Sequence, residues 1–255
     1  MVTDLLMRVF GWKVTLVYGD PCVYDRWDWL HRHCSRGPIR TLDAGCGSGA
    51  LTLGAARLGN QAVGLSFDED NNTKATNRAK LLGLSNVTFV TLDLRQLENY
   101  IGQLGLFDQV ISTETIEHII DDAKLIRDLA KVVKPGGKLF LTTPFEGSLG
   151  LWRDRVPSTP PVEDGGHVRW GYTHDQLRRL LSDNGFTVIQ EDFITGYVSQ
   201  RLTNLFRRMS AVLPYPLVWL LTLPMRTIRC LDRPMTRLLR YPYLSVAVVA
   251  TRTNE

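Results

Sequence analysis

Hydrophobic residues along the chain fall into short runs, separated by polar segments in which apolar residues recur with helical spacing. Short β-branched runs predict strands, whereas apolar residues three and four apart predict helices. Strands are expected at residues 40–44, 61–66, 87–92, 107–112, 138–143, 186–193 and 244–251. Helices are expected at residues 23–33, 51–58, 69–82, 122–133 and 173–184. Because strands and helices alternate, the pattern predicts an α/β fold with a mostly parallel sheet.

The segments between these elements predict how the chain is organised. Residues 1–37 are expected to form a helical lead-in, and the Lys-Pro-Gly-Gly sequence at residues 134–137 a turn. Residues 146–166 contain several prolines and glycines, which is typical of a long loop. Because this loop follows the carboxyl end of a strand, where ligands of such sheets bind, we expect it to act as a lid.

Charge is distributed unevenly. The whole chain has a formal net charge of +4, but residues 197–243 contain eight arginines, no lysine and one acidic residue, which gives that segment +7 and the remainder −3. This localisation argues against a protein that coats nucleic acid and indicates a local anionic partner. The four cysteines show no Cys-x-x-Cys spacing, no secretory leader is evident, and no apolar run reaches the roughly 20 residues of a membrane span. These features favour a cytoplasmic protein.

A glycine-rich turn follows the first predicted strand. Asp43 precedes three glycines at alternate positions, Gly45, Gly47 and Gly49. Glycines permit positive φ angles and close approach of the backbone to a ligand, here at the start of the next helix. The spacing differs from the dinucleotide fingerprint Gly-x-Gly-x-x-Gly, and the lysine of a phosphate loop is missing. The turn resembles motif I of the class I S-adenosylmethionine-dependent methyltransferases.

This resemblance extends to the order of elements over residues 38–196 and to the final segment, 244–255. It implies a Rossmann-like fold, with a seven-stranded, mostly parallel sheet, helices on both faces and a helical insertion at 197–243 before the last strand. It also implies S-adenosylmethionine as the cofactor and S-adenosylhomocysteine as the product. In the family, the glycines of the turn lie against the methionine part of the cofactor. By the same resemblance, Asp43 faces the ammonium group or orders the loop.

The remaining cofactor contacts depart partly from the family pattern. Where the family has an acid for the ribose hydroxyls, at the tip of the second strand, this chain has Ser66, and Asp68 is the expected substitute. Asp93 matches the family acid beside adenine, and the adjoining Leu94 and, after the fourth strand, Glu114 complete the expected cofactor-binding set. Without those contacts, Asp68 would be a solvated acid and Asp93 a strand-end cap.

The fourth strand leads into a block with ionisable side chains, Glu114-Thr-Ile-Glu117-His118. In a helical turn, positions i, i+3 and i+4 share one face, so two carboxylates and an imidazole would converge. Such groups can bind Mg²⁺ or another divalent metal, which lowers the pKa of a coordinated hydroxyl. The block therefore predicts a metal site beside the reacting atoms.

The same block resembles those of the ubiquinone-pathway O-methyltransferases and of the plant small-RNA 2′-O-methyltransferases. In the second family, a histidine ahead of an aromatic-Thr pair completes the metal site, and His167 matches it with one residue more before Thr173. The alternative needs no metal, because His118 or His167 would act as a general base near neutral pH. Glu117, His118 and His167 are the expected catalytic residues.

The insertion at residues 197–243 interleaves its arginines with Leu, Trp, Met and Pro. An apolar wedge with an arginine rim is typical of a helix that lies on an anionic membrane surface. A cap over the active site and a homodimer surface are alternatives, and RNA is disfavoured by the absence of lysine.

Together these features predict an O-methyltransferase that acts on a hydroxyl of a lipid-linked, glycosidic or other small-molecule acceptor, with or without a metal. The first alternative is a metal-independent natural-product or quinol methyltransferase. An alternative of another class is a non-catalytic subunit of a membrane enzyme that keeps the fold. The protein is expected in the cytoplasm, as a free or a peripheral membrane protein.

Overall fold

A computed structural model describes residues 2–17 and 21–253 of the chain. Its centre is a seven-stranded sheet in the order β3-β2-β1-β4-β5-β7-β6. The strands are β1 (Arg40–Ala44), β2 (Gln61–Ser66), β3 (Val87–Thr91), β4 (Phe107–Thr113), β5 (Val133–Pro144), β6 (Phe186–Ile194) and β7 (Ser245–Arg252). Strands β1 to β5 pair in parallel, whereas β7 runs antiparallel to both β5 and β6. The predicted α/β fold with a mostly parallel seven-stranded sheet is therefore confirmed.

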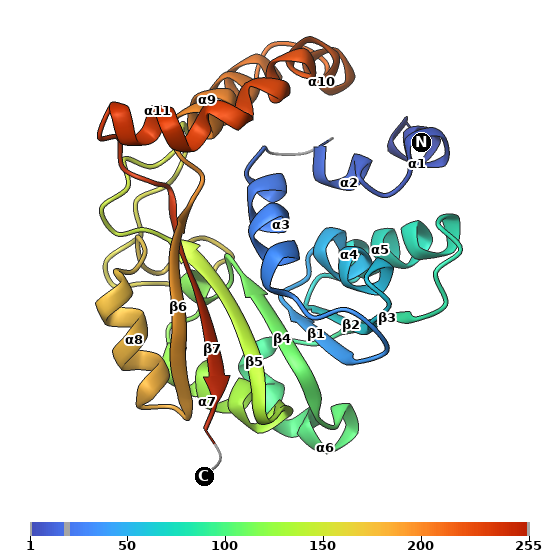
Figure 1. The fold of residues 1–255 in the computed structure, drawn as a ribbon, viewed down its shortest axis with the longest axis vertical. Coiled ribbons are helices and arrows are strands. Elements are labelled where there is room, and N and C mark those ends of the chain that lie inside the picture. The colour runs from blue at the N-terminus through green and yellow to red at the C-terminus, as the bar shows by residue number, and fades with distance from the viewer. Residues whose placement is uncertain (1, 18–20, 254–255) are drawn as a thin grey trace.

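Helices cover both faces of the sheet (Figure 1). One face packs against α3 (Pro21–His33), α4 (Ala50–Arg57) and α5 (Glu69–Leu81), and the other against α6 (Ile101–Leu104), α7 (Asp122–Val132) and α8 (His174–Ser182). Strand residues alternate between the two cores. Phe140 belongs to the first, whereas its neighbours Leu139 and Leu141 belong to the second. The strand middles are thus filled by the two cores, and the parallel direction of β1 to β5 brings their carboxyl ends together at one edge.

The N-terminal lead-in forms α1 (Val2–Phe10) and α2 (Val14–Val17). Trp12, between them, packs edge-on against Trp27 of α3 with ring centroids 4.7 Å apart, and its indole N–H donates to the carbonyl of Ala50 at 3.0 Å. These contacts fix the lead-in to the start of α4, which is the helix that follows the glycine turn.

Two local features differ from the sequence-based expectation. Residues 94–104, for which no element was predicted, form η1 (Leu94–Tyr100), a 3₁₀ helix, followed by α6. The expected turn at residues 134–137 lies inside β5, where the pairing with β4 steps from Phe107–Val133 to Gln109–Lys138. The turn residues therefore bulge out of the ladder, with Gly136 at a φ of +73°.

The insertion folds as α9 (Tyr197–Ser210), α10 (Tyr215–Thr222), η3 (Pro224–Leu231) and α11 (Asp232–Leu238). These helices form a layer beyond the carboxyl ends of the parallel strands (Figure 1). The buried Asp232 accepts hydrogen bonds from the amides of Gly196 and Ser199, at 2.7 and 2.9 Å, and so ties α11 to the start of α9. Arg229 of η3 forms an ion pair with the buried Asp25 of α3. Within the described residues, no helix has both the length and the apolar character needed to cross a bilayer.

The capping box at the start of α8 gives a test of local stability. Thr173 Oγ1 accepts from the Gln176 amide at 3.2 Å, and the Thr173 amide donates to the Gln176 side chain at 2.6 Å. Thr173→Ala should lower the free energy of unfolding by about 1 kcal/mol, because it leaves a helix N–H without a partner. Urea unfolding measures the loss. Thr173→Ser keeps the hydroxyl and should stay near the original stability; an equal loss in both variants would show that the hydroxyl is not what stabilises this helix.

Candidate active site

The glycine turn joins β1 to α4 and is held from below by β2. The amides of Gly45 and Cys46 both donate to the carbonyl of Leu65, at 3.0 and 2.8 Å. Gly45, Gly47 and Gly49 have φ angles of +93°, +50° and +80°, which favour glycine. A Cβ on Gly45 would lie 2.4 Å from the Thr115 hydroxyl, whereas one on Gly47 would meet nothing within 4 Å. The turn therefore presents open backbone at Gly47, at the start of α4, as a ligand cradle requires.

Asp43 lies directly below this turn and is almost completely buried. One carboxylate oxygen accepts from Thr52 Oγ1 at 2.6 Å, and the other has no hydrogen-bond partner among the described residues. Burial raises the pKa of Asp43 to about 6, against the smaller opposing effect of Thr52. A buried acceptor without a partner costs about 1–3 kcal/mol, so this oxygen is well suited to a donor that arrives with a ligand.

The expected ribose and adenine residues lie at the ends of β2 and β3, where the sequence placed them. Asp68 caps α5, with its two oxygens accepting from the amide and side-chain nitrogens of Asn71 at 3.1 and 2.8 Å. Asp93 accepts from the Arg95 guanidinium at 2.9 Å, which holds its pKa below the usual range. Leu94 is buried in the core beside it. These side chains already have protein partners, so their contacts with the cofactor stay predictions.

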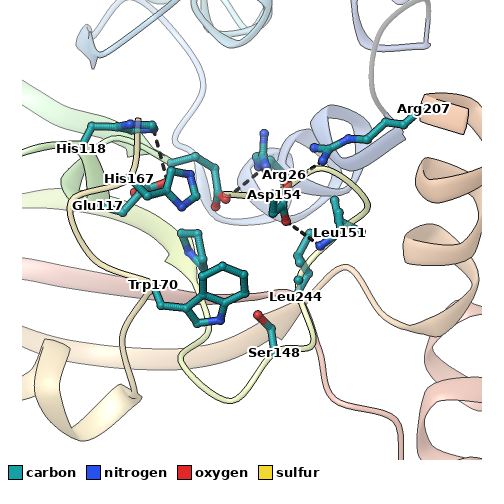
Figure 2. Close-up of a pocket in the computed structure, with 13 residues that line it drawn as sticks. Arg26, Glu117, His118, Ser148, Leu151, Asp154, His167, Trp170, Arg207 and Leu244 are labelled. Carbon is teal, nitrogen blue, oxygen red and sulfur yellow. Dashed lines mark hydrogen bonds and ion pairs between the residues drawn. The ribbon is translucent and has the colours of Figure 1, made fainter. Parts of the chain in front are cut away.

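A second cluster surrounds a cavity of about 130 Å³ at the carboxyl ends of β4 and β5. All four residues proposed from the sequence as metal ligands line it, namely Glu114, Glu117, His118 and His167. Figure 2 shows the two imidazoles and Glu117 gathered at one end of the cavity, with Arg26, Asp154 and Arg207 at the other.

Three of the four residues form one group. Candidate ligand atoms of Glu117, His118 and His167 all lie within 4.8 Å of one another. His118 Nδ1 lies 2.9 Å from the carbonyl of Gly166, which can only accept, so Nδ1 carries the hydrogen and Nε2 is left as an electron-pair donor. That Nε2 is 3.9 Å from Glu117 Oε1.

Glu117 and His167 are both placed in surroundings that disfavour charge. Glu117 is fully buried, and its Oε2 accepts from Thr143 Oγ1 at 3.1 Å. Within the part of the chain that the structure describes, its Oε1 has no hydrogen-bond partner. Burial, with the nearby Glu114 carboxylate adding to it, raises the pKa of Glu117 well above its usual value. Burial, with His118 adding to it, lowers the pKa of His167. A cation between the unpartnered carboxylate oxygen and a nitrogen of each imidazole would satisfy all three groups, so the residues present fit a divalent metal.

Glu114 does not join this group. It has a φ of +49° and precedes the single 3₁₀ turn η2 (Ile116–His118), so the helical spacing assumed from the sequence does not apply to it. Its carboxylate instead pairs with Arg26 at 3.2 Å and accepts from Thr142 Oγ1 at 2.9 Å. The strained backbone turns this side chain toward α3, and its ligand and cofactor roles stay predictions.

Several residues of the cavity wall had no signal in the sequence. Arg26 comes from α3, Asp154 and Trp170 from the loop region after β5, and Arg207 from α9. Arg207 pairs with Asp154 at 2.6 Å. These positions are brought together by tertiary packing across more than a hundred residues, which no local spacing reports. The close pair Asp93 and Arg95, in contrast, could have been recognised as a possible ion pair from sequence.

The loop at residues 146–166 is fastened at its far end to both halves of the site. Glu163 accepts from the Ile120 amide at 2.7 Å and from Arg95 at 2.8 Å, the same Arg95 that holds Asp93. Three residues later, Gly166 accepts from His118, and the Val168 amide donates to the Glu117 carbonyl at 2.8 Å. The position of His167 therefore depends on contacts made by this loop.

Comparison with known proteins agrees with the cofactor site suggested by the glycine turn. A family model described as a methyltransferase domain matches residues 25–191, which is more than half of the chain. The chain belongs to the class I S-adenosylmethionine-dependent methyltransferases. This confirms the family and the cofactor expected from the glycine turn.

Curated relatives and solved structures agree with this membership. The ubiquinone biosynthesis O-methyltransferase of Xanthomonas oryzae pv. oryzae is 36% identical over 119 residues, which are 46% of this chain and 48% of that protein. That of Albidiferax ferrireducens is 35% identical over 122 residues, 46% of each chain. The chain thus aligns with about half the length of these relatives. Among solved structures, magnesium protoporphyrin IX methyltransferase from Synechocystis with bound S-adenosylhomocysteine superimposes with a TM-score of 0.58 at 18% identity, over 99% of this chain and 98% of that one. Coclaurine N-methyltransferase bound to N-methylheliamine and S-adenosylhomocysteine gives 0.60 at 15% identity, over 89% and 71%. At these identities the structures show the fold.

The residues of this methyltransferase fit its cofactor. The open backbone at Gly47 and the unpartnered oxygen of Asp43 lie at the same end of the sheet, next to the strand whose end holds Glu117 and His118. Gly47→Ala should therefore weaken binding of S-adenosylhomocysteine about ten-fold or more, because the new methyl group enters the cofactor space. Calorimetric titration measures the affinity.

Gly83→Ala is the matched control for Gly47→Ala. Gly83 has a φ of +64° and, like Gly47, open space around the position of a Cβ, so the backbone strain is similar. Both variants should unfold slightly more easily, and only Gly47→Ala should lose affinity. Equal affinities in the two variants would remove the glycine turn from the cofactor site.

The Glu163 contact yields a second prediction. Glu163→Gln keeps an acceptor for Ile120 but removes the charge that pairs with Arg95, so hydrogen exchange in residues 146–166 should become faster. Because an exposed ion pair contributes only about 0.2–1 kcal/mol, the increase should be a few-fold. Glu191→Gln breaks the comparable Arg178–Glu191 pair, 2.7 Å long and similarly exposed, and should leave the loop unchanged. Unaltered exchange in Glu163→Gln would mean that the ion pair does not order the loop.

Proposed function

We propose that this methyltransferase transfers the methyl group of S-adenosylmethionine to a hydroxyl oxygen of a small molecule. The observation that carries the proposal is the group formed by Glu117, His118 and His167 at one end of the cavity beyond β4 and β5. A hydroxyl is a weak nucleophile until its proton is drawn away, and this group can accept or displace that proton. The similarity to ubiquinone biosynthesis O-methyltransferases supports the same reaction class.

In the proposed reaction, the residues of the chain bind, orient and remove a proton. The cofactor supplies an electrophilic methyl group. The backbone around Gly47 and the free oxygen of Asp43 would hold the amino-acid end of the cofactor at the ends of β1 and β2. The cavity wall would orient the acceptor for in-line attack, and such positioning supplies much of the rate in group transfer.

We further propose that Glu117, His118 and His167 hold a divalent metal, with Mg²⁺ one of the ions that the site could take. A metal bound there would lower the pKa of a coordinated acceptor hydroxyl. Glu117 Oε1 is the atom that favours this interpretation, since it is buried without a partner and its desolvated carboxylate gains most from a neighbouring cation. Glu114, paired with Arg26, would act as an outer neighbour.

Metal-independent catalysis is the second candidate within the same class. In this case His118 Nε2 or His167, which both line the cavity, takes the proton directly. The acceptor would then be a natural product or a quinol whose hydroxyl is already acidic. A catalytically silent partner subunit of a membrane enzyme is the candidate of another class.

The acceptor and its location form the finer part of the proposal. We infer a lipid-linked or glycosidic acceptor and a protein that works peripherally on the cytoplasmic side of a membrane, because the arginine-rich layer of α9 to α11 borders the acceptor cavity through Arg207. A homodimer built on the same layer is the competing use of this surface.

One assay separates these candidates. Incubated with methyl-labelled S-adenosylmethionine and a solvent extract of the source cells, the protein should transfer label to an extractable compound. Chelator treatment should reduce transfer about ten-fold or more, and Mg²⁺ or Mn²⁺ should restore it. His118→Ala and His167→Ala should lose transfer but keep their calorimetric affinity for S-adenosylhomocysteine; His31→Ala, in α3 and outside the cavity, is the control.

The other outcomes each favour one alternative. Full activity after careful demetallation, with the same loss in the two histidine variants, would favour the general-base mechanism. Binding of S-adenosylhomocysteine without transfer to any compound of the extract would favour the silent subunit. Direct titration with Mn²⁺ gives a readout independent of activity, and Glu117→Gln should weaken Mn²⁺ binding.

A further inference from the structure

The layer formed by the insertion exposes an unusual amount of apolar surface. About half of the large apolar side chains that are exposed within the described residues lie between positions 212 and 239. We call one part of this surface the apolar face. It consists of six exposed residues of α10 and η3, namely Leu217, Leu220, Leu221, Met225, Ile228 and Leu231. Exposed apolar side chains gathered on two consecutive helices are typical of an interaction site.

Positive charge borders this apolar face. Arg208, Arg233, Arg237 and Arg240 are exposed on the neighbouring helices α9 and α11 and just after them. The only acid of residues 197–243 is Asp232, which is buried and accepts hydrogen bonds from the amides of Gly196 and Ser199. The segment therefore has no exposed carboxylate of its own to balance the arginines. Its partner must be both anionic and apolar.

A second copy of the chain does not meet this requirement. In a two-fold dimer built on the apolar face, the same patch would face itself, so the surrounding arginines of the two copies would also be brought together. Like charges across an interface are unfavourable. A nucleic acid would meet the arginines but would leave the leucines of α10 in water. A bilayer with acidic headgroups offers negative charge at its surface and hydrocarbon directly below.

The geometry points to α10 and η3 as a docking face for an anionic lipid bilayer, and we propose that it lies in the membrane interface. The apolar face enters the boundary between headgroups and acyl chains, and the four arginines contact the headgroups. Since α10 holds eight residues, it lies in the interface and does not cross the bilayer.

The same face is connected to the acceptor cavity. Helix α9 packs against α10 and η3, and its Arg207 is part of the cavity wall. Arg229 of η3 pairs with Asp25 of α3. Arg26, which follows Asp25 in α3, pairs with Glu114 in the cavity. Docking would therefore bring the acceptor cavity close to the bilayer from which a lipid-linked acceptor is taken. This last step rests on the proposed function, whereas docking itself does not.

Vesicle flotation with the full chain tests the docking face. The protein should float with vesicles that contain one-third phosphatidylglycerol, should not float with pure phosphatidylcholine, and should be released by high salt. Leu220→Glu should abolish flotation. Arg237→Gln should lower the partition coefficient about five-fold, as expected for one arginine near an anionic surface.

Matched controls come from residues outside the insertion. Ile189→Glu changes an exposed apolar residue of β6, and Arg57→Gln changes an exposed arginine of α4; both should float as the original protein does. Equal flotation of Leu220→Glu and the original protein would overturn the proposal. The proposal would also be overturned if the original protein floated with neither kind of vesicle. A dimer seen by sedimentation and dissociated by Leu220→Glu would overturn it as well.

Binding of S-adenosylhomocysteine is measured in every variant, and it separates the two proposals. If the original protein binds S-adenosylhomocysteine but does not float with anionic vesicles, the docking face is overturned and the methyltransferase function stands. If it floats but does not bind S-adenosylhomocysteine, the proposed function is overturned and the docking face stands.

Discussion

The close contact between Gly45 and Thr115 holds the two halves of the site together. Gly45 belongs to the turn after β1, and Thr115 to the turn after the adjacent strand β4. Because Gly45 has no Cβ, the Thr115 side chain can occupy that space, and its hydroxyl donates to the carbonyl of Thr113 at 3.1 Å. Any larger residue at position 45 would push the turns apart. The glycine turn and the turn that carries Glu117 and His118 are thus positioned by one backbone approach that only glycine permits.

The sequence allowed the sheet to be predicted because strand burial leaves a periodic record. Alternating apolar residues and the glycine turn were enough to place the predicted cofactor residues at the correct edge of the sheet. Glu114 was harder, because its left-handed φ interrupts the helical spacing that would have put it beside Glu117. Arg26 and Arg207 could not be found at all, since their places in the cavity wall depend on how α3 and α9 pack rather than on neighbours in sequence.

The buried side chain of Glu117 must be stabilised either as a neutral acid or beside a cation. A carboxyl group without water must be neutral or must have a cation beside it. Thr143 satisfies one oxygen, and the other faces His118 Nε2 at 3.9 Å, too far for a hydrogen bond. A proton on Glu117 and a metal between Glu117 and the imidazoles are therefore two solutions to the same desolvation problem. In both solutions His118 and His167 stay beside the Glu117 carboxyl group, where an imidazole nitrogen is close enough to share a metal with it.

Helix α3 links this chemistry to the outer layer of the molecule through two adjacent residues. Asp25 pairs with Arg229 in η3, and Arg26 pairs with Glu114 beside the catalytic group. Burial raises the pKa of Asp25 and Arg229 opposes that effect, so the ion pair persists only while η3 stays packed on α3. A shift of η3 would uncover a buried charge next to the residue that orients Glu114. The insertion is therefore in contact with the residues that support the site, through Asp25 and Arg26, which are adjacent in sequence.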